Sequence, residues 1–381
     1  MTPDGVTRFG VERTVDACLR ARSERRQRRY RLARPADLRA PLERWLGEEL
    51  GAPVRVGALE RAPGGASKEN FFFSLESGGE RRALLLRLDP GESIVETHRL
   101  REFQVLRAVE GAAPVPRVLA VDPDGVRLER PSLVMERVSG RPQPELDRRP
   151  SGVGIRFEPE LRATLADDFL AALVAIHSVD WRAHDLSAFD VPRAGTAEAA
   201  GWSLAWWERV HTEDAVEEQP VIALAAEWLR AHLPSADRIA IVHGDYRSGN
   251  FLYDDSGRIR AILDWELAHL GDPHEDLGWV VNELFTVRDS SGDKLACGLL
   301  EREEMLARYE RAVDWKIDRE RLRFYEIFNN YKLAVCAHTT ALRIARGQAT
   351  HLAASMALIH AFAHRYVAEL ARALGLGKEG S

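Results

Sequence analysis

The feature that most limits how this chain can fold is an abrupt change of pattern near its middle. Between residues 54 and 137, short β-branched and apolar runs alternate with turn residues, which is typical of an antiparallel sheet. Beyond residue 160, apolar residues recur mainly at helical spacing. The stretch between these parts is rich in Pro, Gly and Arg, which suit neither element. The sequence therefore predicts an α+β protein of two lobes, one built on a sheet with one helix and one mainly helical.

These changes of pattern divide the chain into four expected segments. They are a basic N-terminal arm or helix over 1–35, a sheet-based lobe over 36–138, an inter-lobe segment over 139–159 and a helical lobe over 160–381. In the sheet-based lobe we expect a helix from Ser93 to Val109, with Ser93 as its N-cap. In the second half the spacing predicts helices over 160–179, 196–211, 220–232, 294–313, 320–344 and 350–374.

Composition excludes several classes of protein. The 53 Lys and Arg residues against 59 Asp and Glu give a net charge of −6, which offers no overall attraction to nucleic acid or anionic lipid. The cysteines, Cys18, Cys297 and Cys336, are too far apart in sequence to suggest a disulfide framework. The first thirty residues contain no secretion signal pattern. We expect a cytoplasmic protein without a membrane or nucleic-acid partner, and leave its oligomeric state open.

One local concentration of charge stands near the N-terminus. Arginines crowd a short segment whose only acid is Glu24: Arg20, Arg22, Arg25, Arg26, Arg28, Arg29, Arg31 and Arg34. The segment could contact an anionic partner. We favour a solvated helix face or arm, because no aromatic interleaving or nucleic-acid motif accompanies the arginines.

The residues that suggest chemistry lie in a strand-like patch within the helical half. An apolar run ends at Val242, a polar loop follows, and two further apolar runs flank a turn at residues 255–257. A hairpin centred on residue 257 would place Asn250 opposite Asp264. A carboxylate and an amide oxygen at one end of a hairpin suit a hard cation such as Mg²⁺. The sequence thus predicts Asn250 and Asp264 as metal ligands, with Asp245 beside the ion.

The spacing in this patch matches what phosphoryl transfer requires. That reaction needs one carboxylate to receive a hydroxyl proton, and an Asn and an Asp to hold metal on nucleotide phosphates. His243-x-Asp245-x-x-x-x-Asn250 has the spacing of a kinase catalytic loop, although His243 itself is more often structural. Arg247 could place a fixed positive charge beside the transferring phosphate. We therefore predict Asp245 and Arg247 as catalytic residues.

Together these motifs resemble the aminoglycoside phosphotransferase and choline kinase-like family, from about residue 40 to about residue 370. The resemblance rests on three runs: His243-Gly244-Asp245-x-x-x-Gly249-Asn250, Asp264-Trp265 and Gly271-Asp272-Pro273-x-x-Asp276-Leu277. It implies a protein kinase-like fold, ATP or alternatively GTP in the cleft with Mg²⁺, and a small-molecule hydroxyl acceptor. It also implies that Asp245 is the catalytic base, and that Asp272 and Asp276 support the loop. Trp265 and Glu266 stand where protein kinases have Phe and Gly.

Three parts of the first half are candidates for nucleotide binding. A Gly-rich turn with Gly64, Gly65 and Ser67 could fold over phosphates, although an ordinary hairpin is the alternative. Arg87 and Glu102 stand where a Lys–Glu pair positions phosphates in protein kinases, with Glu96 as a competing partner. If Arg87 instead lies on an exposed edge strand, it has no such role.

The end of the sheet-based lobe is where a hinge would meet adenine. Met135, Glu136 and Val138 are the candidates there, while ordinary core packing explains a methionine in an apolar strand equally well. For the acceptor, Trp202, Trp206 and Trp207 could line a pocket, but core packing is the commoner explanation. The acceptor stays open among aminoglycosides, choline-like compounds, sugars and hydroxyacyl thioesters.

Two other functions compete with a small-molecule kinase. A catalytically silent, kinase-like nucleotide-binding protein would carry the same motifs. A metallophosphatase is superficially suggested by His269, Asp272 and His274, but the chain lacks an Asp-x-His opening and a Gly-Asn-His triplet. We therefore predict an ATP- and Mg²⁺-dependent kinase that acts on a small-molecule hydroxyl.

Overall fold

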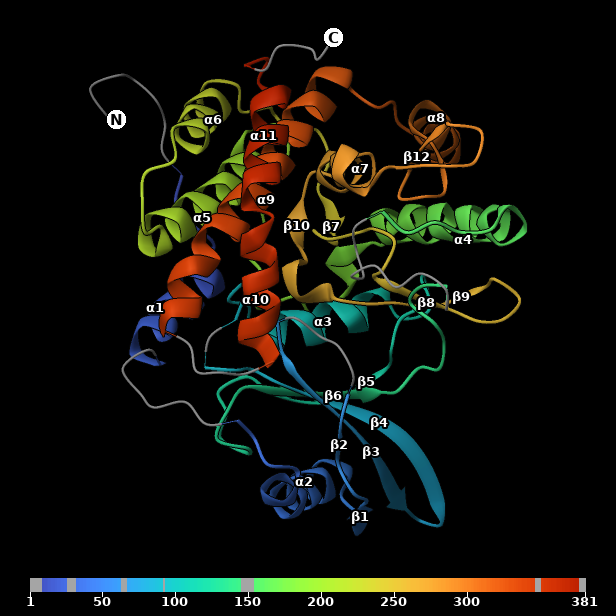
Figure 1. The fold of residues 1–381 in the computed structure, drawn as a ribbon. Helices are drawn as coiled ribbons and strands as arrows, with labels where there is room; N and C mark the ends of the chain where they lie inside the picture. The colour runs from blue at the N-terminus through green and yellow to red at the C-terminus, as the bar shows by residue number, and fades with distance from the viewer. Residues whose placement is uncertain are drawn as a thin grey trace.

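The two-lobed α+β architecture predicted from the sequence is confirmed (Figure 1). A computed structural model describes residues 9–25, 32–62, 67–91, 93–144, 154–346 and 351–376. Gly64 and Gly65 of the Gly-rich turn lie outside the described residues. In Figure 1 the sheet lies at the bottom, with helix α2 beneath it, and most of the other helices lie above. No helix in the described ranges combines the length and apolar character needed to cross a bilayer.

The sheet of the first lobe is antiparallel, in the order β1-β3-β4-β6-β5, with β2 paired to β3. Its strands are β1 Val54–Val56, β2 Glu60–Arg61, β3 Glu69–Ser77, β4 Glu80–Leu88, β5 Val118–Asp122 and β6 Ser132–Glu136. Gly78 and Gly79, with φ of 58° and 85°, form the tight turn between β3 and β4 because both need left-handed backbone. Alternate residues of β3 are buried, and α2 (Pro35–Leu50), which the sequence reading missed, packs against them.

Helix α3 (Arg99–Val109) begins six residues later than predicted. Ser93 is not its N-cap, because His98 holds the cap position in extended conformation. Residues 93–98 instead form an irregular connection from β4 to α3, in which Glu96 accepts a hydrogen bond from the Ser93 amide. The helical periodicity extended into this segment, but its polar groups bind partners outside any helix.

Most of the predicted helices of the second lobe are present. The helices are α4 Pro159–Ser178, α5 Glu198–Asp214, α6 Pro220–Ala231, α7 His274–Val280, α8 Arg302–Ala312, α9 Arg319–Arg346, α10 His351–Ala361 and α11 Ala363–Ala373. The helix predicted over 294–313 is wrong in its first part. A small sheet of β11 (Val287–Arg288), β12 (Lys294–Ala296) and β13 (Leu300–Glu301) precedes α8 there. Cys297 and Gly298 both have positive φ, which breaks the helical pattern.

Helix α1 (Arg13–Arg25) precedes the sheet in sequence but packs against the helical lobe. Its Val15 and Leu19 belong to the same buried cluster as Leu204 of α5. Arg22 is completely buried, so the interpretation of this segment as a solvated face is wrong for that residue. Four of the other arginines lie outside the described residues: Arg26, Arg28, Arg29 and Arg31.

The turn at Gly298 gives a test of the second lobe's packing. Its φ is +70°, and a Cβ there would lie 2.0 Å from the carbonyl oxygen of Ile155. We expect Gly298→Ala to lower the free energy of unfolding by clearly more than the ~1–2 kcal/mol that left-handed backbone costs an alanine. Gly292→Ala is the control, since its φ is +95° with no atom within 4 Å of the added Cβ. Equal losses for the two variants in urea unfolding would contradict the close approach at Gly298.

Candidate active site

Two short antiparallel strand pairs carry the candidate site. Strand β7 (Ala240–Val242) pairs with β10 (His269–Gly271), and β8 (Phe251–Tyr253) pairs with β9 (Ile259–Ile262). The loop over 243–250 connects β7 to β8, as the predicted order of strand, loop, strand, turn and strand requires.

The predicted register of this hairpin is wrong by one residue. The Leu263 amide donates to the Asn250 carbonyl at 2.8 Å, so Leu263, and not Asp264, lies opposite Asn250. The pairing shifts between Leu252 and Tyr253, an irregularity that the turn residues alone do not reveal. Asp264 follows with left-handed backbone, at φ 59° and ψ 53°, which sends the chain into the short helix η2 (Trp265–Leu267).

A buried carboxylate fixes the start of the loop. Asp276 of α7 accepts the amide of His243 at 2.7 Å and that of Gly244 at 2.9 Å. From α9, Lys332 donates to the Gly244 carbonyl at 2.8 Å. Gly244 has φ +80°, and a Cβ there would lie 2.8 Å from the Leu267 carbonyl oxygen. The backbone before Asp245 is therefore held from two helices, and a side chain at Gly244 would clash.

His243 acts as a spacer between the loop and the hairpin. Its Nε2 lies 2.9 Å from the Leu263 carbonyl, while the Asp245 amide donates to its Nδ1 at 3.1 Å. These partners require a neutral ring with the proton on Nε2. Burial lowers the pKa of His243, which favours that neutral form. The ring therefore positions Asp245 and has no position from which to exchange a substrate proton.

The carboxylate of Asp245 gathers two predicted site residues. Asn250 Nδ2 donates to Oδ2 at 2.6 Å, and Arg247 Nε lies 2.9 Å from Oδ1. Burial opposes the charge of Arg247, but Asp245 raises its pKa overall. In this structure, Arg247 contacts Asp245, the expected base. The predicted role of Arg247 beside the transferring phosphate stays a prediction.

Asp264 lies beside the cationic side of the site. Arg87 Nη1 lies 3.3 Å from Asp264 Oδ1, and the side chain of Asp264 is 49% exposed. Partial burial raises the pKa of Asp264, Arg87 opposes this rise, and the carboxylates of Glu266 and Asp245 add to it. A carboxylate crowded by other acids is stabilised by a cation.

The donor atoms of Asn250 and Asp264 fit Mg²⁺. Because the amide nitrogen of Asn250 donates to Asp245, its oxygen is the atom left to face a cation. Mg²⁺ prefers hard oxygen ligands and commonly takes one or two protein carboxylates plus substrate phosphates. Within the described part of the chain, no group of three or more His, Cys, Asp or Glu side chains could hold a metal. Phosphate oxygens would have to complete the coordination.

The predicted contact between Arg87 and Glu102 is present. Arg87 of β4 places Nη1 3.1 Å from Glu102 Oε1 on α3, and Glu102 is almost completely buried. Glu96, the competing candidate, contacts Arg25 instead. Burial alone would lower the pKa of Arg87, but Glu102, Asp264 and Glu266 raise it overall. The Arg87–Glu102 pair therefore joins β4 to α3, and Arg87 also contacts Asp264, the candidate metal ligand.

Three charged residues that the sequence analysis did not assign to the site lie around Arg87: Glu266 contacts it, and Lys68 and Arg99 share that acid. Glu266 Oε2 lies 3.6 Å from Arg87, 3.6 Å from Lys68 and 3.8 Å from Arg99. Arg99 also contacts Glu102. Ser67, predicted to cradle phosphates, lies close enough to Glu266 to help lower the pKa of that carboxyl against the effect of burial. The available signal was Glu266 itself, a charged residue where protein kinases have glycine.

The residues predicted to meet adenine are Met135, Glu136 and Val138, and their surroundings differ. Met135 is 3% exposed, pairs with Leu85 and lies in the core, as the packing alternative proposed. Glu136 pairs its side chain with Arg82, and its amide donates to another backbone carbonyl. The amide of Arg137 donates to the Ala83 carbonyl, so neither of these two amides is free for a nucleotide, and the contact of Val138 with adenine stays a prediction.

Several other sequence candidates lie away from these residues. Trp206 and Trp207 stack on each other at 5.7 Å in the helical core, which supports packing over a pocket. His274 Nδ1 lies 2.7 Å from Asp272, and its Nε2 accepts the Asp318 amide. These histidine contacts are structural and do not form the two-metal site of a phosphatase.

Asp276 gives the site a dependence on pH. Burial opposes its ionisation, but the hydrogen bond and charge of His177, together with the hydrogen bond from the His243 amide, hold its pKa below the ordinary 3.8. The stability from this lowered pKa is fully present above pH ~4 and is lost as the pH falls through the folded-state value. We expect Asp276→Asn to lower the free energy of unfolding at pH 7 by about 1–3 kcal/mol, with a difference from the native protein that shrinks on acidification. Asp255→Asn, at a 96% exposed side chain, is the control. A difference that stays constant down to pH 3 would contradict the charged role.

Comparisons with known proteins show the family of this chain. The model of the APH family, "Phosphotransferase enzyme family", matches residues 58–325, more than half of the chain. A curated relative, acyl-CoA dehydrogenase family member 10 of Mus musculus, is 29% identical over 66% of this chain. The chain spans only 22% of that protein's length.

Solved structures share the fold. A Ralstonia eutropha JMP134 protein assigned as an aminoglycoside phosphotransferase has a TM-score of 0.63 and 23% identity, covering 90% of this chain and 99% of its own. A thermostable mutant of aminoglycoside phosphotransferase APH(4)-Ia, in a ternary complex with ADP and hygromycin B, has a TM-score of 0.52 and 20% identity, covering 89% of this chain and 99% of its own. The chain therefore belongs to the APH phosphotransferase enzyme family and has its protein kinase-like fold.

Proposed function

We propose that this protein is an ATP- and Mg²⁺-dependent phosphotransferase that moves the γ-phosphate to a hydroxyl group of a small molecule. One observation carries the proposal. Asp245 is fixed by Asn250 on one side of the site, and Asp264 is tied to the Arg87–Glu102 pair on the other. These are two neighbouring sets of contacts, since the charge of Asp245 adds to the rise in the pKa of Asp264. Their proximity supports a base and two metal ligands in one site, as phosphoryl transfer requires.

The reaction follows from the positions of these groups. The acceptor hydroxyl would donate its proton to Asp245 as its oxygen forms the new bond to the γ-phosphorus, and the bond from phosphorus to the ADP oxygen breaks. Arg247, which contacts the base in this structure, would keep positive charge beside the reacting groups. Mg²⁺ held by Asn250 and Asp264 would supply charge neutralisation on the phosphates.

The nucleotide side of the site rests on the cationic cluster. Arg87 would contact phosphate oxygens, and its bidentate guanidinium differs in geometry from the usual lysine. Ser67 and Val138 would contact the phosphates and adenine respectively. The fold-sharing APH(4)-Ia structure contains ADP, which supports an adenine nucleotide as the donor, with GTP as the alternative to test.

The acceptor class to test first is a hydroxyacyl thioester. The curated mouse relative is named for acyl-CoA dehydrogenase, and its matching segment is a small part of a longer protein. Aminoglycosides form the second class, because the fold-sharing APH(4)-Ia complex contains hygromycin B. A panel of hydroxyacyl-CoA esters, aminoglycosides, sugars and choline, assayed for ADP release with and without Mg²⁺, separates these classes.

A silent nucleotide-binding protein is the second candidate, favoured by one contact. Arg247 Nε lies 2.9 Å from Asp245, so the expected base is already paired. Mg²⁺-strengthened ATP binding without transfer to any acceptor in the panel would support this alternative. Transfer to any hydroxyl compound would exclude it.

We expect Asp245→Asn to lower kcat by about 10²–10⁴-fold, because the carboxylate acts mainly on the proton in the transition state. The affinity for Mg²⁺-ATP should change little, since Asp245 is not a predicted nucleotide ligand. Asp255→Asn, in the exposed turn of the hairpin that follows this loop, should retain full turnover. Steady-state kinetics and calorimetric titration check this, and undiminished turnover of the Asp245 variant would contradict its role as base.

We expect Asp264→Ala to act on binding. Loss of a metal ligand should weaken ATP affinity in the presence of Mg²⁺ by about 10–100-fold, as is typical for changes around metal sites. ATP affinity measured with a chelator should change much less. If Mg²⁺ strengthens ATP binding equally in the variant and the native protein, Asp264 does not hold the metal. Asp255→Ala serves as the matched control.

A further inference from the structure

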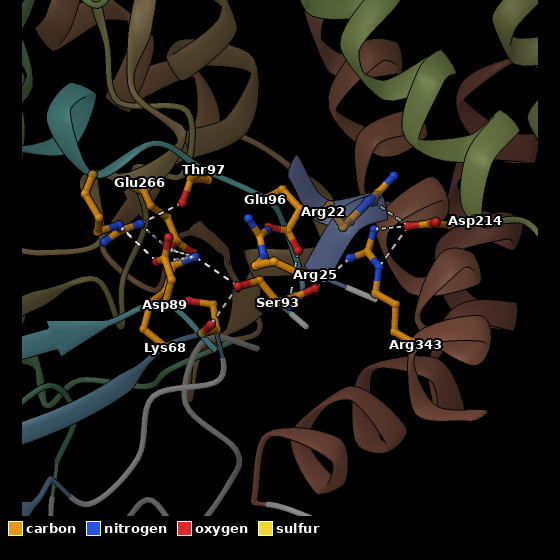
Figure 2. Close-up of polar contacts among 12 residues, drawn as sticks. Arg22, Arg25, Lys68, Asp89, Ser93, Glu96, Thr97, Asp214, Glu266 and Arg343 are labelled. Carbon is orange, nitrogen blue, oxygen red and sulfur yellow. Dashed lines mark hydrogen bonds and ion pairs between the residues drawn. The ribbon is translucent and has the colours of Figure 1, made fainter. Parts of the chain in front are cut away.

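A continuous series of buried polar contacts runs from α1 toward the candidate active site (Figure 2). At the α1 end of this series lies Asp214 of α5, which is fully buried. Arg22 of α1 places Nη1 2.6 Å from Asp214, and Arg343 of α9 places Nη2 2.7 Å from the same oxygen. One carboxylate therefore joins three helices of the helical lobe.

The series continues into the connection between β4 and α3, which belongs to the sheet-based lobe. Arg343 Nη1 donates to the Ser93 carbonyl at 3.0 Å, and Arg25 of α1 pairs with Glu96. Ile94 and Val95 lie in the core cluster of the helical lobe. Residues 93–96 are therefore fastened to the opposite lobe by both charge and apolar packing.

Ser93 links this connection to Lys68 through hydrogen bonds. Lys68 Nζ donates to the Ser93 hydroxyl at 3.0 Å, and that hydroxyl donates to the Ser67 carbonyl at 3.2 Å. On its other side, Lys68 Nζ lies 3.5 Å from Asp89 and 3.6 Å from Glu266. Figure 2 shows Lys68 between Ser93 and these two acids. Lys68 thus joins residues 93–96 to Glu266, the acid that contacts Arg87.

Because Lys68 is buried, its position affects the charge around Arg87. Lys68 is 1% exposed, and a buried ammonium group is tolerated only while its partners hold it. Lys68, Arg87 and Arg99 share Glu266, so a displaced lysine would change the charge around Arg87. Arg87 in turn contacts Asp264. The geometry of the proposed nucleotide site therefore depends on where Lys68 is held.

We propose that Lys68 is a positioning residue of the nucleotide site and that α1 sets it in place through Arg25, Glu96 and Ser93. The inference rests on the proposed phosphotransferase function and adds to it a remote element, a helix of the other lobe, on which nucleotide affinity depends. Coupling of this kind runs through contiguous packed and hydrogen-bonded groups, and single changes along such a series alter affinity by roughly 2- to 30-fold.

The test measures the binding of AMP-PNP with Mg²⁺ to the full chain by calorimetric titration. We expect Lys68→Met, Ser93→Ala and Arg25→Gln each to weaken binding within the range above. Arg20→Gln is the matched control, because Arg20 lies on the same helix, is 74% exposed and pairs with Asp16. Arg25→Lys should restore affinity to near the native value, since it keeps the charge opposite Glu96. Equal affinity of the native protein and Ser93→Ala would overturn the proposal.

A double-mutant cycle tests whether Arg25 acts through Lys68. If it does, the variant with both Arg25→Gln and Lys68→Met binds no more weakly than Lys68→Met alone. Effects that simply add would overturn the link between α1 and Lys68. Circular dichroism and the melting temperature report whether each variant is folded, and Ser93→Ala, which removes only a hydroxyl, carries the test if Lys68→Met unfolds.

The failure of the inference is distinct from that of the proposed function. If the native protein binds Mg²⁺-AMP-PNP while Ser93→Ala and Arg25→Gln bind it equally well, only the inference fails. If the native protein itself does not bind the nucleotide, the proposed function is contradicted, and the inference falls with it.

Discussion

The site depends on the two hydrogen bonds that the buried carboxylate of Asp276 accepts from consecutive backbone amides, those of His243 and Gly244. They fix the path of the chain as it leaves β7. The ring of His243 then spans from the Asp245 amide to the Leu263 carbonyl, so the loop and the hairpin are held at a set separation. Asp245 takes its place from this backbone geometry, and its own side-chain contacts only refine that place.

Local patterns were sufficient to predict much of this molecule. The division into lobes and most of the helices follow from periodicity. The contact of Arg87 with Glu102 follows from the likeness to the Lys–Glu pair of protein kinases. The grouping of Asp245 with Asn250 follows from a short motif on one loop. The hairpin register did not follow, because the irregularity between Leu252 and Tyr253 depends on packing that turn residues do not encode.

The remainder could not be predicted because it depends on partners distant in sequence. Arg22 looked like a surface arginine among many, and its ion pairs with Glu213 and Asp214, 191 and 192 residues away, explain how its charge can be buried. Lys68 and Glu266 were single charged residues until folding brought them together. The segment before α3 had helical spacing, yet its polar groups bind α1 and α9. A buried charge is specified jointly by all its partners, and no window of sequence contains them together.

The attachment of residues 93–96 to the helical lobe also bears on how the two lobes can move. The chain crosses between the lobes near Arg141, whose backbone pairs with Tyr253 of β8. Helix α3 adds further contacts, since Arg101 donates to the Ala268 carbonyl and Gln104 donates to the Ser187 hydroxyl. The sheet-based lobe is therefore held against the helical lobe at several separated places. Any rotation of one lobe against the other would have to break buried polar contacts at one of these places.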